Sequence, residues 1–357
     1  MLDNFKPYHT WHARLAQLVP QNCRTRLVNM SLLIAGLYHA RNVHLSAIVR
    51  KWPLAAKQPS LARRLTRFLA NPAVCVRDWY RPVAEQLLAP FAGQEVRLIV
   101  DGTKVGFGHQ LLMVAIAYRR RALPLAWCWV KGKKGHSGPS KQLALLSYVR
   151  GLLPPHTPVL LVGDSEFGSV GVLRQLQAWH WRFVLRQPGN TLVRPNSRGP
   201  WRRFDRLVQR PGECGWRPGS SWTAKWAYSA NLLICWAATE KAPWLLTTNL
   251  STSRLALQAY RRRMWLDETF GDLKGHGFDL EATHLQHFLR LSRLTLAVCY
   301  LYIWLITFGS RVIKAGLRPL VDRRERRDLS LFRIGWDSIE RRLARGQPVH
   351  VSFQPSR

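Results

Sequence analysis

Two acidic residues stand at the ends of short apolar runs that are typical of β-strands. Asp101 follows the run LIV, and Asp164 follows the run VLLVG. A carboxylate at such a position can be exposed at the edge of a sheet while its backbone is held rigidly. Two of them on neighbouring strands could bind a divalent metal through oxygen ligands, which Mg²⁺ prefers. One acid at a strand end is most often a turn or capping residue, so it is the pairing that favours a functional site.

A third acid lies in the segment YRRRMWLDETFGDLK, which has helical periodicity. At 100° per residue, one narrow stripe of this predicted helix carries Tyr260, Arg263, Asp267 and Lys274. Glu268 falls outside the stripe. The alternative is an exposed amphipathic helix with solvated charges, but the stripe lies directly beside an apolar face, which argues against it.

Three carboxylates from two strands and one helix suffice to hold two metal ions. Phosphodiester cleavage requires activation of a water or a 3′-hydroxyl and stabilisation of the leaving oxygen, and two metal ions about 3.5 to 4 Å apart can do both. We therefore predict that Asp101, Asp164 and Asp267 are catalytic and bind two Mg²⁺ ions, with Mn²⁺ as a substitute.

The composition indicates a folded protein with a cationic exterior. The chain has 357 residues, with 54 Lys plus Arg against 20 Asp plus Glu, and a formal net charge of +34. Because 47% of the residues are hydrophobic, an intrinsically disordered chain is excluded. A surface of this sign binds polyanions, so double-stranded DNA is the leading partner, and charge alone leaves RNA open.

A basic protein of membrane surfaces is the competing class. The longest apolar stretch, residues 294–308, is shorter than the about 20 residues that a membrane span needs. We predict a buried helix there and no membrane. The first residues lack the charged-then-apolar order of a signal peptide, which favours a cytoplasmic protein. We expect reduced thiols at all six cysteines, which are far apart in the sequence: Cys23, Cys75, Cys128, Cys214, Cys235 and Cys299.

Strands mixed with helices, and acids at strand ends, predict an α/β core. Changes in composition and periodicity divide the chain into five predicted regions. They are a helical N-terminal DNA-binding region (1–94), a first part of the catalytic core (95–187), a β-rich insertion (188–250), a helical part of the core with the third acid (251–310) and a basic C-terminal tail (311–357).

The N-terminal region contains a helix with a basic edge, LARRLTRFLANP. Its arginines are Arg63, Arg64 and Arg67. They either solvate a helix face or contact phosphates, and the net charge favours phosphate contact for the group.

The four stripe residues resemble the signature Y-x2-R-x3-E-x6-K of the IS-four family of bacterial insertion-sequence DDE transposases. The spacing in this sequence matches at Tyr260, Arg263, Asp267 and Lys274. The two strand acids match the family's first two catalytic positions, and the resemblance covers about residues 32–343. It implies an RNase H-like, retroviral-integrase-like mixed sheet core with a helical DNA-binding bundle and a helical C-terminal region.

One position departs from the signature. The family's third acid is Glu, whereas Asp267 has a side chain that is one methylene shorter, and Glu268 follows it. Either Asp267 reaches the metal through a small helix shift, or Glu268 replaces it, or this copy is impaired. Helix phase and spacing both favour Asp267, with Glu268 in reserve.

The resemblance implies a cut-and-paste transposase that binds terminal inverted repeats, cleaves DNA strands and transfers the freed 3′ ends to target DNA. It further implies a homodimer in the DNA complex, a DNA hairpin intermediate and a bacterial, nucleoid-associated location. Tyr260, Arg263 and Lys274 would hold transposon-end phosphates. Trp244, in WLLTTN, would stack on an extruded base, unless it is simply a core tryptophan at a strand start.

Two other functions remain open. A decayed copy could be a DNA-binding protein without catalysis, which the aspartate at position 267 would support. A metal-dependent DNA nuclease without strand transfer is the alternative among enzymes.

Overall fold

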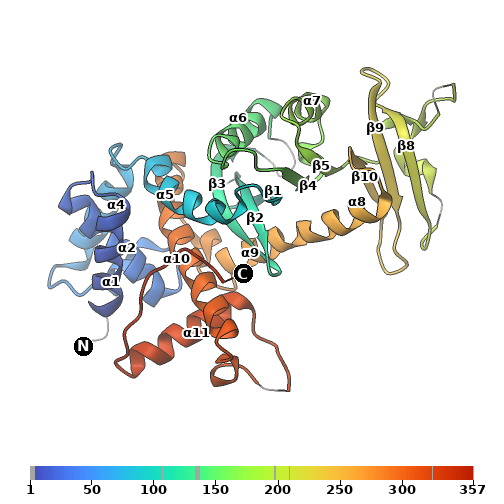
Figure 1. Cartoon of the computed structure of the whole chain (residues 1–357). Coiled ribbons are helices and arrows are strands. Elements are labelled where there is room, and N and C mark those ends of the chain that lie inside the picture. The colour runs from blue at the N-terminus through green and yellow to red at the C-terminus, as the bar shows by residue number, and fades with distance from the viewer. Residues whose placement is uncertain are drawn as a thin grey trace.

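The computed structural model describes residues 5–106, 108–132, 137–196, 198–208, 210–323 and 325–356. The described residues form a mixed sheet of ten strands with helices around it, which confirms an α/β fold (Figure 1). In spatial order the strands are β3 (Arg121–Lys131), β2 (His109–Tyr118), β1 (Val96–Val105), β4 (Val159–Gly163), β5 (Arg182–Arg186), β10 (Trp244–Thr248), β9 (Tyr228–Cys235), β8 (Cys214–Trp222), β6 (Leu192–Arg194) and β7 (Arg202–Arg203).

The centre of the sheet brings the two predicted strand acids together. Strand β1 pairs in parallel with β4, and β4 pairs in parallel with β5. Val100 is opposite Gly163 in the β1–β4 register. Asp101 and Asp164 are the next residues along the chain, so the two acids lie at the same level on neighbouring parallel segments. Asp164 directly follows β4, as predicted. Asp101, by contrast, does not stand at a strand end as the sequence predicted, because β1 continues to Val105 through its pairing with β2.

Helices cover both faces of this part of the sheet. Helices α6 (Pro139–Arg150) and α7 (Val170–Ala178) lie on one side, and α8 (Ser253–Tyr260) and α9 (Met264–Leu273) lie on the other (Figure 1). Helix α8 begins after Thr252, whose side chain accepts a hydrogen bond from the backbone N–H of Leu255. Such a cap satisfies a backbone donor that the first turn leaves free.

The predicted single helix over residues 260–274 is only partly correct. Tyr260 ends α8, residues 261–263 form a 3₁₀ turn, and α9 runs from Met264 to Leu273. Lys274 follows the helix with φ −100° and ψ −132°, so it no longer has helical phase.

The apolar stretch at 294–308 lies in helix α10 (Phe288–Lys314), which is buried as predicted. Its length and apolar character would also suit a membrane span, but 83% of its most apolar window is covered by the rest of the chain. Its ring contacts include those of Trp304 and Tyr300 with Trp11. Around it lie the N-terminal helices α1 (Phe5–Leu18), α2 (Arg24–Ala40), α3 (Leu45–Val49), α4 (Gln58–Ala70) and α5 (Val76–Leu88), and the C-terminal helix α11 (Leu331–Ala344).

Strands β6 to β9 extend the sheet away from the helical bundle, at the right of Figure 1. Here one expectation about the cysteines was wrong, because Cys214 and Cys235 form a disulfide. They are 21 residues apart in the sequence, but β8 and β9 pair in a register that places them directly opposite, with Cα atoms 4.2 Å apart. Among the described residues, the other four cysteines are free thiols.

Candidate active site

Arg263 connects the first and third predicted acids. Its Nη1 donates to Oδ2 of Asp101 at 2.5 Å, and its Nη2 lies 3.2 Å from Oδ2 of Asp267. Asp101 is only 1% exposed, and its Oδ1 accepts a hydrogen bond from the backbone N–H of Gly102 at 2.7 Å. The strand acid Asp101 and the helix acid Asp267 therefore meet at one guanidinium. It belongs to Arg263, which precedes Asp267 by four residues.

Asp164 completes the group of carboxylates. Its Oδ1 is buried and has no hydrogen-bond partner among the described residues. Burial raises the pKa of Asp101 to about 7, and the negative charges of Asp267 and Asp164 act in the same direction, while Arg263 lowers it. Two further carboxylates are thus close enough to oppose ionisation of Asp101, and one arginine does not compensate all three.

The donor chemistry of this group fits a hard divalent cation. Carboxylate oxygens are what Mg²⁺ takes as protein ligands, and the orphaned oxygen of Asp164 is a buried acceptor that a cation would satisfy. In the described part of the chain, no three acidic, histidine or cysteine side chains are close enough together to hold a metal as they stand. Because Arg263 already holds Asp101 and Asp267, a metal must compete with its guanidinium for these two oxygens.

Tyr260 and Trp244 continue the site beyond Arg263. The Tyr260 ring packs edge-on against the Trp244 ring, with centroids 5.1 Å apart, and the Arg263 guanidinium lies 5.9 Å from the centre of the Tyr260 ring. Burial raises the pKa of Tyr260 to about 12, so its hydroxyl keeps its proton. That hydroxyl has no hydrogen-bond partner in the residues described. Trp244 itself is half-buried at the start of β10, consistent with either a packing or a stacking role.

The structure does not bring Lys274 to this group. Helix α9 ends one residue before it, and its Nζ donates to Oε1 of Glu281 at 2.7 Å. The helical wheel placed Lys274 on the Arg263 stripe because it continued the helix one residue too far. Its role in binding phosphate stays a prediction.

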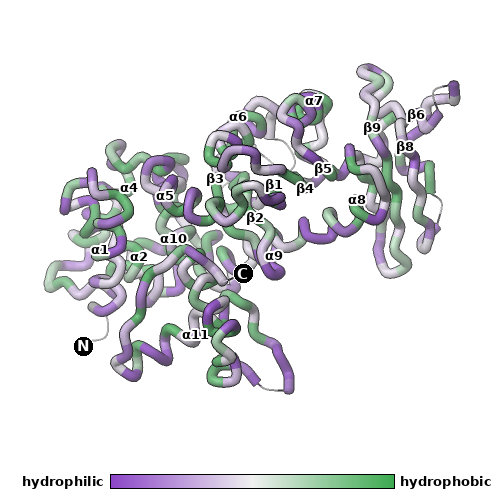
Figure 2. Tube along the Cα trace, viewed as in Figure 1, coloured by the Kyte–Doolittle hydropathy of each residue, from purple (hydrophilic) through white to green (hydrophobic). Residues whose placement is uncertain are grey.

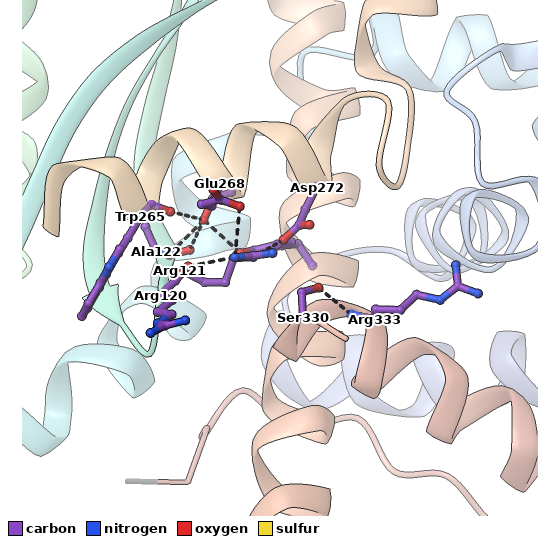
Figure 3. A network of polar contacts seen from close by, with 10 residues as sticks. Arg120, Arg121, Ala122, Trp265, Glu268, Asp272, Ser330 and Arg333 are labelled. Carbon is purple, nitrogen blue, oxygen red and sulfur yellow. Dashed lines mark hydrogen bonds and ion pairs between the residues drawn. The ribbon is translucent and has the colours of Figure 1, made fainter. Parts of the chain in front are cut away.

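Glu268 lies on a different side of α9. Its Oε2 is 3.4 Å from Nη1 of Arg121, at the start of β3, and its side chain is 57% exposed. Figure 3 shows Glu268 and Asp272 on the same helix, both directed to Arg121. The geometry therefore groups Asp267, rather than Glu268, with Asp101, while the identity of the third metal ligand stays a prediction.

Arg121 anchors the helix of the third acid to the sheet. Its Nε donates to Oδ2 of Asp272 at 2.6 Å, and both side chains are almost fully buried. One turn earlier, Thr269 accepts a hydrogen bond from the backbone N–H of Ala122 at 2.8 Å. These contacts fix the position of α9 on β3, and Asp267 with it. This pair could not be predicted from the sequence, because partners 151 residues apart leave no local signal.

Glu166 is a second positioning residue that the sequence analysis missed. Its Oε2 accepts from Nε2 of Gln110 on β2 at 2.9 Å, and its Oε1 accepts from the backbone N–H of Ser137 at 2.6 Å. Glu166 therefore ties the 3₁₀ turn that follows Asp164 to strand β2 and to the segment before α6. The only signal in the sequence is its place two residues after Asp164.

The arginines of α4 lie in the N-terminal bundle, away from the carboxylates. Arg63 and Arg67 are exposed. Arg64 is half-buried, donates to Oδ1 of Asn29 at 2.8 Å and lies 5.9 Å from the centre of the Trp52 ring. Two of the three are therefore available to a ligand, whereas Arg64 also holds α4 to α2.

Comparisons with known proteins identify the family of the chain. No match is found among the curated proteins. Among solved structures, the chain is similar to one described as "Cryo-EM structure of piggyBac transposase synaptic complex with hairpin DNA (SNHP)", with 9% identity over 96% of this chain and 78% of that chain and a TM-score of 0.44. The family model described as "Transposase DDE domain" matches residues 92–304, which is more than half of the chain. The chain therefore belongs to the transposase DDE domain family.

Proposed function

We propose that this protein is a cut-and-paste DNA transposase of the IS-four type, with an RNase H-like catalytic core. It binds terminal inverted repeats, cleaves DNA strands and transfers the 3′ ends to target DNA. Membership in the DDE family supports a transposase that processes DNA. The observation that carries the finer proposal is the position of the three aspartates: Asp101, within β1, and Asp164, directly after the adjacent parallel strand β4, lie at one level, and Asp267 meets Asp101 at Arg263.

Asp101, Asp164 and Asp267 would hold the divalent metal, with Mg²⁺ as the proposed ion, two ions per site and Mn²⁺ as a substitute. The bound metal supplies a Lewis acid that activates the attacking oxygen and stabilises the leaving oxygen. The carboxylates orient that chemistry because β1 and β4 fix two of them and α9 fixes the third. Asp101 is itself buried, so its carboxylate is shielded from bulk water.

Arg263 has a second task in this proposal. Burial alone would lower the pKa of Arg263, but Asp101 and Asp267 raise it above its usual value, so the guanidinium stays charged. A DNA phosphate offers Arg263 an alternative anionic partner for two parallel hydrogen bonds. When Arg263 turns to phosphate, Asp101 and Asp267 become free as ligands. DNA binding and completion of the metal site are then coupled through one side chain.

Tyr260, Lys274 and Trp244 would contact the transposon end. The free Tyr260 hydroxyl is a buried donor beside Arg263, suited to a phosphate oxygen. Trp244 would stack on an extruded base during a hairpin step. We further propose that Arg63, Arg64 and Arg67 contribute to end binding, that a homodimer pairs the two ends, and that the protein acts at the nucleoid in the bacterial cytoplasm without a membrane.

The experiment is cleavage by the Asp164→Ala variant of a duplex taken from the genomic DNA that flanks the gene and carries its inverted repeat. With Mg²⁺, we expect the variant to shift this duplex in a gel as the wild type does but to release no cleaved product. The matched control is the Asp78→Ala variant, which replaces an exposed aspartate in the first turn of α5. This variant should cleave the duplex as the wild type does. Cleavage by Asp164→Ala at the wild-type rate would refute the site.

The same assay separates the two other functions. A target plasmid is added, and joined products show strand transfer. Cleavage without joining would identify a nuclease. Binding without cleavage by the wild type would identify an impaired copy, for which the short Asp267 side chain, held by Arg263, gives the structural reason.

A further inference from the structure

A cationic cleft of about 770 Å³ lies along the side of α9 that carries Trp265 and Glu268. Its walls are the turn between β2 and β3, the start of α9, the end of α10 and the segment that leads into α11. Six arginines line it: Arg119, Arg120, Arg121, Arg261, Arg318 and Arg327. The segment before α11 is strongly hydrophilic, shown in purple in Figure 2.

Two of these arginines serve the fold. Arg121 is bound to the buried Asp272, and Nε of Arg318 donates to Oδ2 of Asp322 at 2.7 Å. The cleft also contains two acids, but both have partners: Glu268 lies against Arg121, and Asp328 pairs with Arg326 at 3.0 Å. These acids therefore do not neutralise the other arginines.

The remaining four arginines are exposed cations: Arg119, Arg120, Arg261 and Arg327. None of them has a carboxylate partner within the residues that the structure describes. Four like charges that gather in one concave surface repel one another, and the low dielectric of the walls strengthens the field. A polyanion relieves this repulsion and releases its counterions on binding.

The backbone of the β2–β3 turn indicates that two of these four arginines, Arg119 and Arg120, are there for function rather than for the turn itself. Tyr118 pairs with Arg121, so the turn consists of Arg119 and Arg120, with φ values of 42° and 63°. Two-residue turns of this kind normally take Asn-Gly or Gly-Gly, because side chains with a Cβ are strained at positive φ. Here two arginines occupy both strained positions, and each presents its side chain at the cleft.

The cleft is held in place relative to the catalytic carboxylates. The buried Arg121–Asp272 pair joins the turn to α9, and Figure 3 shows Arg120 beside this pair. Asp267 and the cleft thus lie on different sides of one helix, whose diameter with side chains is about 10 to 12 Å. Trp265 also lines the cleft and adds a flat apolar surface.

We propose that this cleft binds the phosphodiester backbone of a second DNA segment, separate from the segment at the three aspartates. The ligand chemistry is a run of phosphates, because several spread guanidinium groups match a run better than one anion. The source is either target DNA or the flank of the transposon end. The assignment of a source rests on the proposed transposase function, whereas the binding of phosphodiester backbone does not.

The first test measures affinity for a random 30-base-pair duplex by fluorescence anisotropy over a range of salt concentrations. In the variant R120Q/R261Q/R327Q, we expect the slope of log affinity against log salt to fall by about 2 to 3, since each lost phosphate contact contributes about 0.9. The matched control R150Q/R174Q/R254Q removes three exposed arginines far from the cleft and should change the slope by less than about 1. Equal slopes in the two variants would overturn the proposal.

A lysine variant, R120K/R261K/R327K, keeps the charges and should recover most of the slope. If it matches the glutamine variant instead, the loss comes from altered folding, and the cleft does not bind phosphates. All substituted side chains are exposed, and circular dichroism spectra like that of the wild type are expected for every variant.

The second test identifies the source. Protein assembled on the flank-derived end duplex is offered a target plasmid, and capture of the plasmid and retention of the end are measured separately. Loss of plasmid capture alone in the glutamine variant assigns the cleft to target DNA, and loss of end retention assigns it to the flank. Normal capture and normal retention together would overturn the proposal. Were the wild type inactive in cleavage, the salt slopes would still decide whether the cleft binds DNA.

Discussion

Helix α9 takes part in two clusters of acids and arginine that differ in their balance of charge. In the proposed catalytic cluster, Asp101 and Asp267 share Arg263, and Asp164 adds an oxygen without a hydrogen-bond partner among the described residues. In the anchoring cluster, Asp272 has Arg121 to itself inside the protein, because Glu268 is mostly exposed. One cluster has more buried carboxylate than its arginine satisfies, and the other is paired one to one.

This difference separates a site that must accept a ligand from a contact that must hold the fold. An excess of carboxylate is costly unless a cation arrives. Burial raises the pKa of both buried acids, to about 7 for Asp101 and to about 6 for Asp272, but only at Asp101 do two further carboxylates, Asp267 and Asp164, add to the rise beside a shared arginine. A buried carboxylate whose charge is balanced by its own hydrogen-bonded arginine, as Asp272 is by Arg121, has its main partner within the fold. Substitutions in the two clusters should therefore have opposite consequences for activity and for stability.

The largest expected effect is on catalysis by Asp267→Ala. Loss of a ligand for the proposed metal removes transition-state stabilisation of several kcal/mol, so DNA cleavage should fall on the order of 10³-fold or more. The Asp267 side chain is partly exposed, so the free energy of unfolding should change by less than about 1 kcal/mol. Single-turnover cleavage and urea unfolding measure the two. Strong destabilisation would show that Asp267 belongs to the anchor instead.

Next in size is the stability change caused by Asp272→Ala. The substitution leaves the Arg121 guanidinium buried beside only the exposed Glu268, which should lower the free energy of unfolding by about 3 to 5 kcal/mol. Urea unfolding gives the value. The double variant Arg121→Met with Asp272→Leu replaces the pair by apolar groups and should recover most of the loss. No recovery would mean that the hydrogen bonds of Arg121, rather than its charge, hold α9.

A third prediction concerns pH and the catalytic cluster. The pKa of Asp101, at about 7, lies above its ordinary value, so the carboxyl is protonated below pH 7 and must lose that proton to bind a metal. In protein without DNA, Mn²⁺ affinity should rise about tenfold per pH unit up to about pH 7 and level off above it. Electron paramagnetic resonance measures the concentration of free Mn²⁺, from which the affinity at each pH follows. In the control Asp101→Asn, affinity should be lower and this slope absent; a persistent slope would assign the proton to another group.

The sequence indicated which acids the fold brings near one another, Asp101, Asp164 and Asp267, but not the anchor, and the reason is physical. Acids that follow apolar runs, such as Asp101 and Asp164, are local patterns, and the parallel pairing of β1 with β4 then places them at one level. Even there the local pattern failed to show that β1 continues past Asp101 to Val105. Arg121 and Asp272 meet only through packing between β3 and α9, which no spacing in the sequence records.

Local rules also failed where helix geometry changed. The 3₁₀ turn at residues 261–263 and the end of α9 at Leu273 remove Lys274 from the stripe that an uninterrupted helix predicts. The disulfide between Cys214 and Cys235 likewise depends on the register of β8 with β9.

The smallest effect is expected from Glu268→Gln, which keeps the shape of the side chain and removes its charge. Glu268 is 57% exposed and lies 3.4 Å from Arg121, so its ion pair should contribute at most about 1 kcal/mol to stability. Cleavage should stay within about threefold of the wild type, because the charge that faces Asp101 is that of Asp267. Single-turnover cleavage is measured for Glu268→Gln and, separately, for Asp267→Asn. Both substitutions keep the shape of the side chain and remove its charge, so the two variants can be compared directly. If cleavage fell about 10³-fold in Glu268→Gln and stayed near normal in Asp267→Asn, the proposed assignment would be wrong, and Glu268 would be the third metal ligand.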